Sequence, residues 1–173
     1  MTTQIKTKWF WLWQDEKEEE WLRSMAQQGL HLKEIRLLNR YVFEEGTPQD
    51  IVYRLDFLTN NKDYPGYLQL FRDAGWEHVA VNGSWQYFRK PAAQGAAPEI
   101  FTDNASKIQK YQRLVAILVV FSVIFSPALN NFDPVRYGWV GGAVQVLRAL
   151  LLLAIAVNLI MLAKRIIQLR KTV

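Results

Sequence analysis

Two uninterrupted apolar stretches distinguish the last third of this chain from the rest. Residues 114–129 read LVAILVVFSVIFSPAL and residues 149–163 read ALLLLAIAVNLIMLA, and neither stretch contains a charged side chain. Over the first hundred residues, apolar positions instead recur among charged ones at the spacings of amphipathic helices and half-buried strands. The pattern predicts a globular domain followed by a hairpin of two apolar helices.

Helical spacing occurs twice in the globular part. The first segment runs from Asp15 to Gly29 and the second from Asp63 to Gly75, and glycine is a frequent helix terminator. Asp15 and Glu18 have the spacing of a capping box. We therefore expect the acidic run over residues 15–20 to be the solvated first turn of a helix, with ordinary pKa values.

Each helix is flanked by segments with the alternating pattern of strands. The six segments are residues 9–13, 30–36, 40–45, 51–57, 76–81 and 84–89. The last two are joined by Asn82-Gly83, which favours a type I′ turn. The order predicts a duplicated β-α-β-β unit, which gives an α+β domain with a mostly antiparallel sheet and two helices on one face.

This pattern divides the chain into three parts. We expect a globular domain over residues 1–90, a linker over 91–106 that is rich in alanine and proline, and a membrane hairpin over 107–173. The spans cover about 112–130 and 143–163, and a short basic tail follows the second. A soluble helical hairpin is the alternative, but two such continuous apolar runs favour a membrane.

The charge distribution indicates which kind of partner the chain binds. The net charge is +5, yet residues 1–112 hold 14 Lys and Arg against 15 Asp and Glu, whereas residues 113–173 hold 7 against 1. A nucleic-acid-binding surface would need clustered basic residues on the globular part. We therefore expect no nucleic acid, and we expect the lipid bilayer, with its anionic headgroups, to be a partner.

The same charges predict the orientation in the membrane. Seven Lys and Arg flank the outer ends of the two spans, and the loop between them has only Arg136. The positive-inside rule then places both termini in the cytoplasm and the protein in the plasma membrane with two spans. The chain has no cysteine, which fits a reducing compartment.

Aromatic residues supply the candidate binding surface. Six of the seven tryptophans fall between positions 9 and 85, and the predicted layout leaves one sheet face uncovered by this chain. That face is either polar or a working surface for a partner or ligand, with these candidates: Trp9, Trp11, Trp13, Trp85 and Tyr87. The alternative is that these large aromatic side chains belong to the core.

Few polar residues suggest any other site. Asn158, at mid-depth in the second span, is a candidate for an intramembrane contact across a helix interface, with satisfaction by the neighbouring span as the alternative. Arg54 and Asp56 are expected to form a surface pair. The two histidines, His31 and His78, should lie on opposite sheet faces, which argues against a metal site.

The sequence also has no phosphate-binding glycine loop and no serine in a nucleophile elbow. We therefore expect no catalytic residues, no cofactor and no metal, and we interpret the protein as a non-enzymatic one.

Several segments carry a family resemblance. They include Trp9-Phe10, Glu18-Glu19-Glu20-Trp21-Leu22, the "DAGWE" segment at 73–77 and the "YFRK" segment at 87–90. Over about residues 9–90 the chain resembles the bacterial domain-of-unknown-function family 2812. The resemblance implies a cytoplasmic domain joined to membrane spans in Gram-positive bacteria, often encoded beside PadR-like regulators, with no established activity. Leu30 departs from the pattern, in which Trp is expected as at position 76.

Three functional hypotheses from different classes follow. The first is a membrane-anchored, non-enzymatic cytoplasmic module that binds a protein partner, a small apolar ligand or a second copy, in a sensory, regulatory or envelope-related role. The second is an accessory or immunity subunit of a membrane transport or stress-response system, which acts through its transmembrane hairpin. An enzyme acting on a membrane-associated substrate is the third class, for which the sequence offers no residue.

Overall fold

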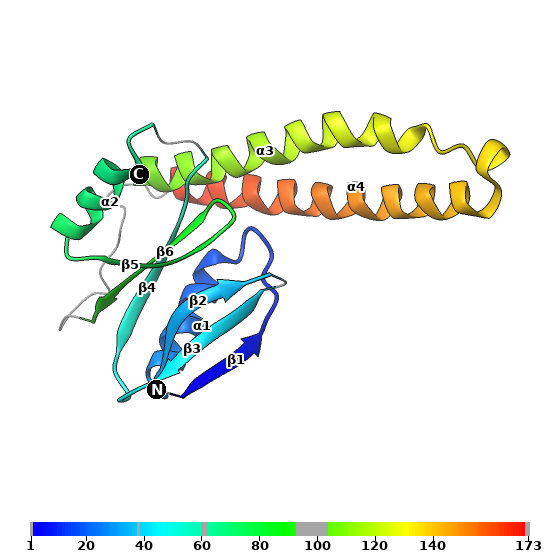
Figure 1. The fold of residues 1–173 in the computed structure, drawn as a ribbon. Coiled ribbons are helices and arrows are strands. Elements are labelled where there is room, and N and C mark those ends of the chain that lie inside the picture. The colour runs from blue at the N-terminus through cyan, green and yellow to red at the C-terminus, as the bar shows by residue number, and fades with distance from the viewer. Residues whose placement is uncertain (1, 38, 60–61, 93–103, 172–173) are drawn as a thin grey trace. The chain divides into compact units, whose positions relative to one another are not determined.

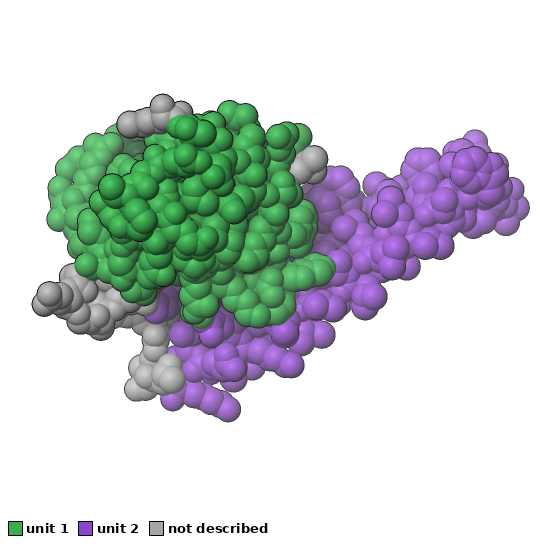
Figure 2. All heavy atoms as spheres, turned by 90° about the horizontal axis from the view of Figure 1, so that it is seen from below, with its two compact units in different colours: residues 1–103 green, residues 104–173 purple. Residues whose placement is uncertain are grey.

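The computed structural model describes residues 2–37, 39–59, 62–92 and 104–171 (Figure 1). The chain divides into two compact units, residues 1–103 and residues 104–173, which Figure 2 draws in different colours. Unit 1 is the α+β part, and unit 2 consists of two long helices.

Unit 1 contains six strands and two helices in its described part. They are β1 (Thr3–Thr7), α1 (Asp15–Ala26), β2 (Leu30–Arg36), β3 (Arg40–Glu45), β4 (Ile51–Phe57), α2 (Tyr64–Asp73), β5 (Glu77–Asn82) and β6 (Trp85–Pro91). All strand pairs are antiparallel, and the strands form two sheets in the orders β1-β3-β2 and β4-β6-β5. The predicted α+β fold and its β-α-β-β order are confirmed, with two three-stranded sheets in place of one.

The two halves share local features at matching positions. Both helices are followed by a glycine with positive φ, Gly29 at 80° and Gly75 at 79°. Both hairpins then have an irregular register four residues after that glycine, at Lys33 between β2 and β3 and at Val79 between β5 and β6. The common origin of the two halves stays a prediction from the sequence.

The larger hydrophobic cluster joins α1 to both sheets. Its buried members are Leu22, Met25, Ala26, Leu30, Leu32, Tyr41, Phe43, Ile51, Tyr53, Leu55, Ala80 and Tyr87. Because α1 contributes the first three, β2 and β3 the next four and the second sheet the rest, this one helix connects the two sheets.

The smaller cluster lies on the other face of the second sheet. It contains Val52, Phe71, Trp76 and Phe88. Neighbouring residues on a strand point to opposite faces. Val52 and Phe88 therefore face α2, whereas their neighbours Tyr53 and Tyr87 face α1. The prediction placed both helices on one sheet face; the second sheet is instead covered on both faces, and buried residues accordingly occupy almost all of β4.

The strand predicted over residues 9–13 is wrong. The first strand is β1, and residues 8–14 connect it to α1. The polar, threonine-bounded segment Thr3–Thr7 pairs with β3 along its whole length, Thr3 opposite Glu44 and Thr7 opposite Arg40. The apolar run over residues 9–13 does not mark a strand, since Phe10 packs into the core while Trp9 and Trp11 are exposed.

Unit 2 contains α3 (Asn104–Asn130) and α4 (Pro134–Lys171). By length and composition, the segments 107–130 and 134–171 could each cross a membrane. The connection between them is shorter than the predicted loop over residues 130–142, because helix resumes at Pro134 and bends at Gly138, which has φ 56° and ψ −135°. Of the predicted linker, residues 93–103 lie outside the described residues, and 104–106 already belong to α3.

Candidate functional site

The five aromatic residues predicted to share a surface lie in different environments. Trp9 is 69% exposed and Trp11 is 42% exposed. Trp13 and Trp85 are half-buried, and Trp85 packs against Phe57 at 5.1 Å between ring centroids. Tyr87 is only 2% exposed, so its place on a binding surface is contradicted. Trp9 and Trp11 are the two members that are exposed.

The segment that presents these two tryptophans is fixed to the core beneath it. Phe10 lies 5.7 Å from Trp21 and 6.5 Å from Tyr41, between ring centroids. Two hydrogen bonds close the end of the segment that leads into α1, from Gln14 N to Trp11 O at 2.8 Å and from Trp11 N to Gln14 Oε1 at 3.1 Å. The backbone groups of Trp11 are thus both satisfied, and the segment is held on either side of Phe10 by these bonds and by the packing of the Phe10 ring.

Basic residues border the exposed tryptophans. The Lys8 ammonium lies 5.2 Å from the Phe10 ring centroid and 4.9 Å from that of Trp21. Lys8 N donates to Asn39 O at 3.3 Å, which places the segment beside the turn between β2 and β3. In this turn region Leu37 is 84% exposed, and the exposed Arg40 begins β3. We call Lys8, Trp9, Trp11, Leu37 and Arg40 the aromatic-basic patch.

The acidic run of α1 is not a solvated turn. Asp15, Glu18 and Glu19 are buried, and only Glu16 and Glu20 remain exposed. The capping box is also absent: α1 begins at Asp15 itself, and the residue before it, Gln14, forms no side-chain capping hydrogen bond. The prediction failed because the free edge of β4 and two tyrosine hydroxyls in the core need hydrogen-bond acceptors, and the carboxylates of α1 supply them.

Glu18 is the central acceptor. Its Oε1 accepts from Tyr41 Oη at 2.8 Å and from Tyr87 Oη at 2.7 Å, so a carboxylate of α1 links β3 of one sheet to β6 of the other. Burial raises the pKa of Glu18, and these hydrogen bonds oppose that increase only in part. Burial, together with the Glu18 charge, also raises the pKa of both tyrosines. The arrangement is closed to solvent and orders the core.

Glu19 performs a related role at the free edge of β4. Its carboxylate accepts from Leu55 N at 2.8 Å and from Arg54 Nη1 at 3.2 Å. Asp56 is buried and accepts from Tyr67 Oη of α2 at 2.9 Å. The predicted surface pair of Arg54 and Asp56 is therefore wrong, since Arg54 pairs with α1 and Asp56 bonds to α2.

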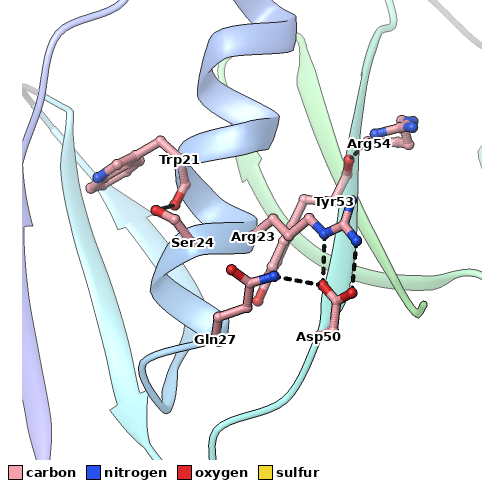
Figure 3. Close-up of polar contacts among 7 residues, drawn as sticks. All are labelled: Trp21, Arg23, Ser24, Gln27, Asp50, Tyr53 and Arg54. Carbon is pink, nitrogen blue, oxygen red and sulfur yellow. Dashed lines mark hydrogen bonds and ion pairs between the residues drawn. The ribbon is translucent and has the colours of Figure 1, made fainter. Parts of the chain in front are cut away.

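An ion pair connects the last turn of α1 to the start of β4 (Figure 3). Arg23 donates to both carboxylate oxygens of Asp50, at 2.6 and 2.7 Å, and Gln27 Nε2 adds a third bond at 3.0 Å. The Arg23 hydrogen bond lowers the pKa of Asp50. All three residues are at the protein surface, and their hydrogen bonds connect the end of α1 to the start of β4.

Polar side chains of α4 cap the end of α3 in unit 2. Gln145 Nε2 donates to Leu129 O at 3.2 Å and to Phe132 O at 3.0 Å, and Arg148 donates to Ser126 Oγ at 3.3 Å. The last carbonyl groups of a helix lack partners within that helix. The two side chains therefore close the hairpin near its turn, which explains two polar residues at this end of an apolar segment.

Asn158 is buried in α4. Its Nδ2 donates to Ala154 O, one turn earlier in the same helix, at 2.8 Å. Within the part of the chain that the structure describes, its Oδ1 has no hydrogen-bond partner. The donor is thus satisfied by its own helix, not by the neighbouring span, and the intramembrane contact stays a prediction.

The histidines occupy unlike places. His31 Nε2 lies 2.9 Å from Thr47 O at the surface, whereas His78 packs against Phe88 and lies 3.0 Å from Gln86 Oε1. Burial lowers the pKa of His78. Across the described ranges, no three His, Asp or Glu side chains are grouped so that they could hold a metal ion.

Comparison with known proteins gives a family and no function. No curated protein and no solved structure matches the chain. The sequence profile described as "Protein of unknown function (DUF2812)" matches residues 14–123, from the start of α1 into the first apolar helix. Since this match covers more than half of the chain, the protein belongs to the DUF2812 family.

Proposed function

We propose that this protein is a membrane-anchored interaction module whose globular unit acts by binding and not by catalysis. The observation that carries the proposal is the pair of long helices with apolar side chains exposed along their length, attached to a unit with its own core. Apolar surface of that extent favours hydrocarbon over water. The partner is a cytoplasmic protein, and the role is regulatory or envelope-related.

Two features support binding over catalysis. The group with the most acid-base interest, Glu18, is 7% exposed and already accepts two hydroxyl hydrogen bonds, so a substrate has no access to it. The exposed polar clusters, such as Arg23 with Asp50, are saturated ion pairs that connect elements. The exposed tryptophans, Trp9 and Trp11, can form contacts but supply no acid-base or nucleophilic group.

Anchoring and orientation are tested first. The protein should remain in the membrane pellet after alkaline carbonate extraction, and release into the supernatant would contradict the anchor. Because the chain has no cysteine, Gln28→Cys in unit 1 and Val135→Cys at the exposed start of α4, next to the connection, report orientation through a membrane-impermeant maleimide. In intact spheroplasts, the cysteine at 135 should react and the cysteine at 28 should react only after lysis; the reverse result would contradict cytoplasmic termini.

Binding is tested by cross-linking in membranes followed by copurification. The matched control is the segment 104–173 alone, which keeps the hairpin and lacks unit 1. A partner that is recovered with the full chain and lost with this control supports the proposal. If the full chain reproducibly recovers no protein beyond the control, the proposal fails.

The buried Asn158 favours a second candidate function, an accessory or immunity subunit that acts within the bilayer. Its Oδ1 lacks a partner in the described residues, and such a group favours a donor from another chain. Exchange of both spans for an unrelated hairpin separates the two candidates. Retained function supports the globular module, whereas lost function with a normally inserted, folded chimera supports the accessory subunit.

A further inference from the structure

We propose that the aromatic-basic patch is a second, peripheral contact of this protein with an anionic bilayer. The inference rests on the proposed function, because it takes α3 and α4 to be membrane spans. It adds a partner for a defined surface of unit 1: the headgroup region of the same membrane. A protein partner would then bind elsewhere on unit 1.

The side chains of the patch match the chemistry of a membrane interface. Tryptophan combines a large apolar ring with an N–H donor, and it is enriched at the level of the headgroups. Trp9 and Trp11 are both exposed, and Leu37 in the adjoining turn is 84% exposed. A single exposed apolar residue needs no explanation, but three on two segments that the hydrogen bond from Lys8 N to Asn39 O joins form a surface that water solvates poorly.

The cations of the patch are available to anionic headgroups. Among the described residues, Lys8 and Arg40 take part in no ion pair, whereas Arg36 on the neighbouring strand is paired with Glu34. Lys8 stacks its ammonium over Phe10 and Trp21, which leaves the charge at the surface. Basic groups near a membrane surface are attracted by anionic lipids, and salt screens that attraction.

The patch is built before it binds. Phe10 fixes the segment to the core, Gln14 satisfies both backbone groups of Trp11, and Asn39 accepts from Lys8 N. A preorganised surface loses little conformational entropy when it docks. Because the spans already hold unit 1 near a membrane, even a weak contact is occupied at the resulting local concentration.

The test uses the full chain with one environment-sensitive label. A nitrobenzoxadiazole group is placed on Thr7→Cys, beside the patch, or on Gln69→Cys, an exposed position of α2 that serves as the matched control. The protein is reconstituted into phosphatidylcholine vesicles with or without about one third phosphatidylglycerol. Doxyl-labelled lipid quenches a label only where it reaches the bilayer interface.

We expect quenching of the label at 7 to be at least threefold that of the label at 69 in the anionic vesicles. The excess should fall in high salt and in phosphatidylcholine alone, and it should disappear in the Trp9→Ser/Trp11→Ser variant while near-ultraviolet circular dichroism still shows a folded unit. Equal quenching at both positions would overturn the inference. The inference would also be overturned if the fluorescence of the label at 7 were the same with and without anionic lipid and rose with the protein-to-lipid ratio, since this indicates contact between copies of the chain.

Flotation of the same vesicles separates the two failures. If the protein does not float with the vesicles after carbonate treatment, the membrane anchor itself is wrong. If it floats and the two labels are quenched equally, the anchor stands and only the peripheral contact is wrong.

Discussion

A carboxylate that accepts two tyrosine hydroxyls away from water is costly to ionise and also costly to remove. Glu18 joins Tyr41 of the first sheet to Tyr87 of the second through one oxygen. Burial disfavours its charged form, while the two donors favour it. At the scale of the residue, the cohesion of unit 1 therefore depends on an acceptor at this position more than on a charge.

Two substitutions separate the acceptor from the charge. Glu18→Leu should lower the free energy of unfolding by about 1–3 kcal/mol for each hydroxyl left without an acceptor. Glu18→Gln keeps an amide oxygen as acceptor and should cost much less. Urea unfolding of the detergent-solubilised chain, followed by tryptophan fluorescence, measures both changes. Glu20→Gln on the exposed side of α1 is the control, and a Leu variant as stable as the Gln variant would contradict this role of Glu18.

The charge of Glu18 should be visible in the pH dependence of stability. Because its pKa is raised in the folded state, the folded protein retains a proton that the unfolded chain releases once the pH exceeds the unfolded value. The free energy of unfolding then falls as the pH rises between the unfolded and the folded pKa, and it stays lower above that window. Unfolding curves between pH 4 and 8 should show this fall in the wild type relative to Glu18→Gln; parallel profiles would contradict it.

The acidic run also shows where sequence reasoning stops. Six polar residues at the start of a helix are usually solvated, and nothing within residues 15–20 marks three of them as buried. The carboxylates of Glu18 and Glu19 are buried because they accept hydrogen bonds from Tyr41, Tyr87 and the edge of β4, and these donors are distant in sequence. Likewise, Tyr87 resembles any strand aromatic until its partner on α1 is known.

At the scale of the element, the two helix-ending glycines offer a matched comparison. Both have φ near +80°, so alanine at either should cost about 1–2 kcal/mol in backbone strain. A Cβ at position 29 would also lie 2.5 Å from the backbone oxygen of Gly46, whereas one at position 75 would meet only the end of the Lys90 side chain at 3.1 Å. Gly29→Ala should therefore destabilise unit 1 clearly more than Gly75→Ala, by thermal unfolding. Equal losses would contradict the close approach at Gly46.

The ion pair between Arg23 of α1 and Asp50, next to β4, should contribute little to stability despite its good geometry. Arg23 and Asp50 form two short hydrogen bonds, but both side chains are about two-fifths exposed. Asp50→Asn should cost about 1 kcal/mol or less, and the loss should shrink in high salt. Since the pKa of Asp50 is lowered in the folded state, its contribution is present above the unfolded pKa and is lost as the pH falls through the folded value. A double-mutant cycle with Arg23→Gln measures the coupling, and a coupling that high salt leaves unchanged would contradict this account.

Elements with a strong local pattern were predictable to the residue. The predicted segments 30–36, 40–45 and 51–57 coincide with β2, β3 and β4. The hairpin of β5 and β6 is also present, but its turn lies one residue later than predicted, because Asn82 pairs with Trp85 and the turn residues are Gly83 and Ser84. Gly83 has φ 60° and Asn82 has no positive φ, so the predicted type I′ turn at Asn82-Gly83 is wrong. The failure at residues 9–13 has a physical reason: five apolar residues in a row fit a strand, yet here they form a connection with an inner and an outer side. β1 lacks that apolar signal because it is an edge strand, exposed along nearly its whole length.

At the scale of the whole molecule, the family match and the compact units have different boundaries. The DUF2812 match runs from residue 14 into α3, whereas unit 1 ends at residue 103. The match therefore contains most of unit 1 together with residues 107–123 of the first candidate span, which runs from 107 to 130. The family model thus combines a globular unit with part of a candidate membrane span, and the question that follows is whether unit 1 needs the span in order to fold.

The position of the buried clusters answers that question with a prediction. All residues of both hydrophobic clusters, and those packed on them, lie between Phe10 and Ala92. A fragment of residues 1–92 should therefore fold without the hairpin, stay in the supernatant without detergent, and unfold in urea at about the midpoint of unit 1 in the full chain. Circular dichroism and ultracentrifugation of the two proteins measure this. A soluble but unfolded fragment would mean that the apolar helices contribute to the fold of unit 1 and do not only anchor it, and the boundary of the folding unit would then move to that of the family match.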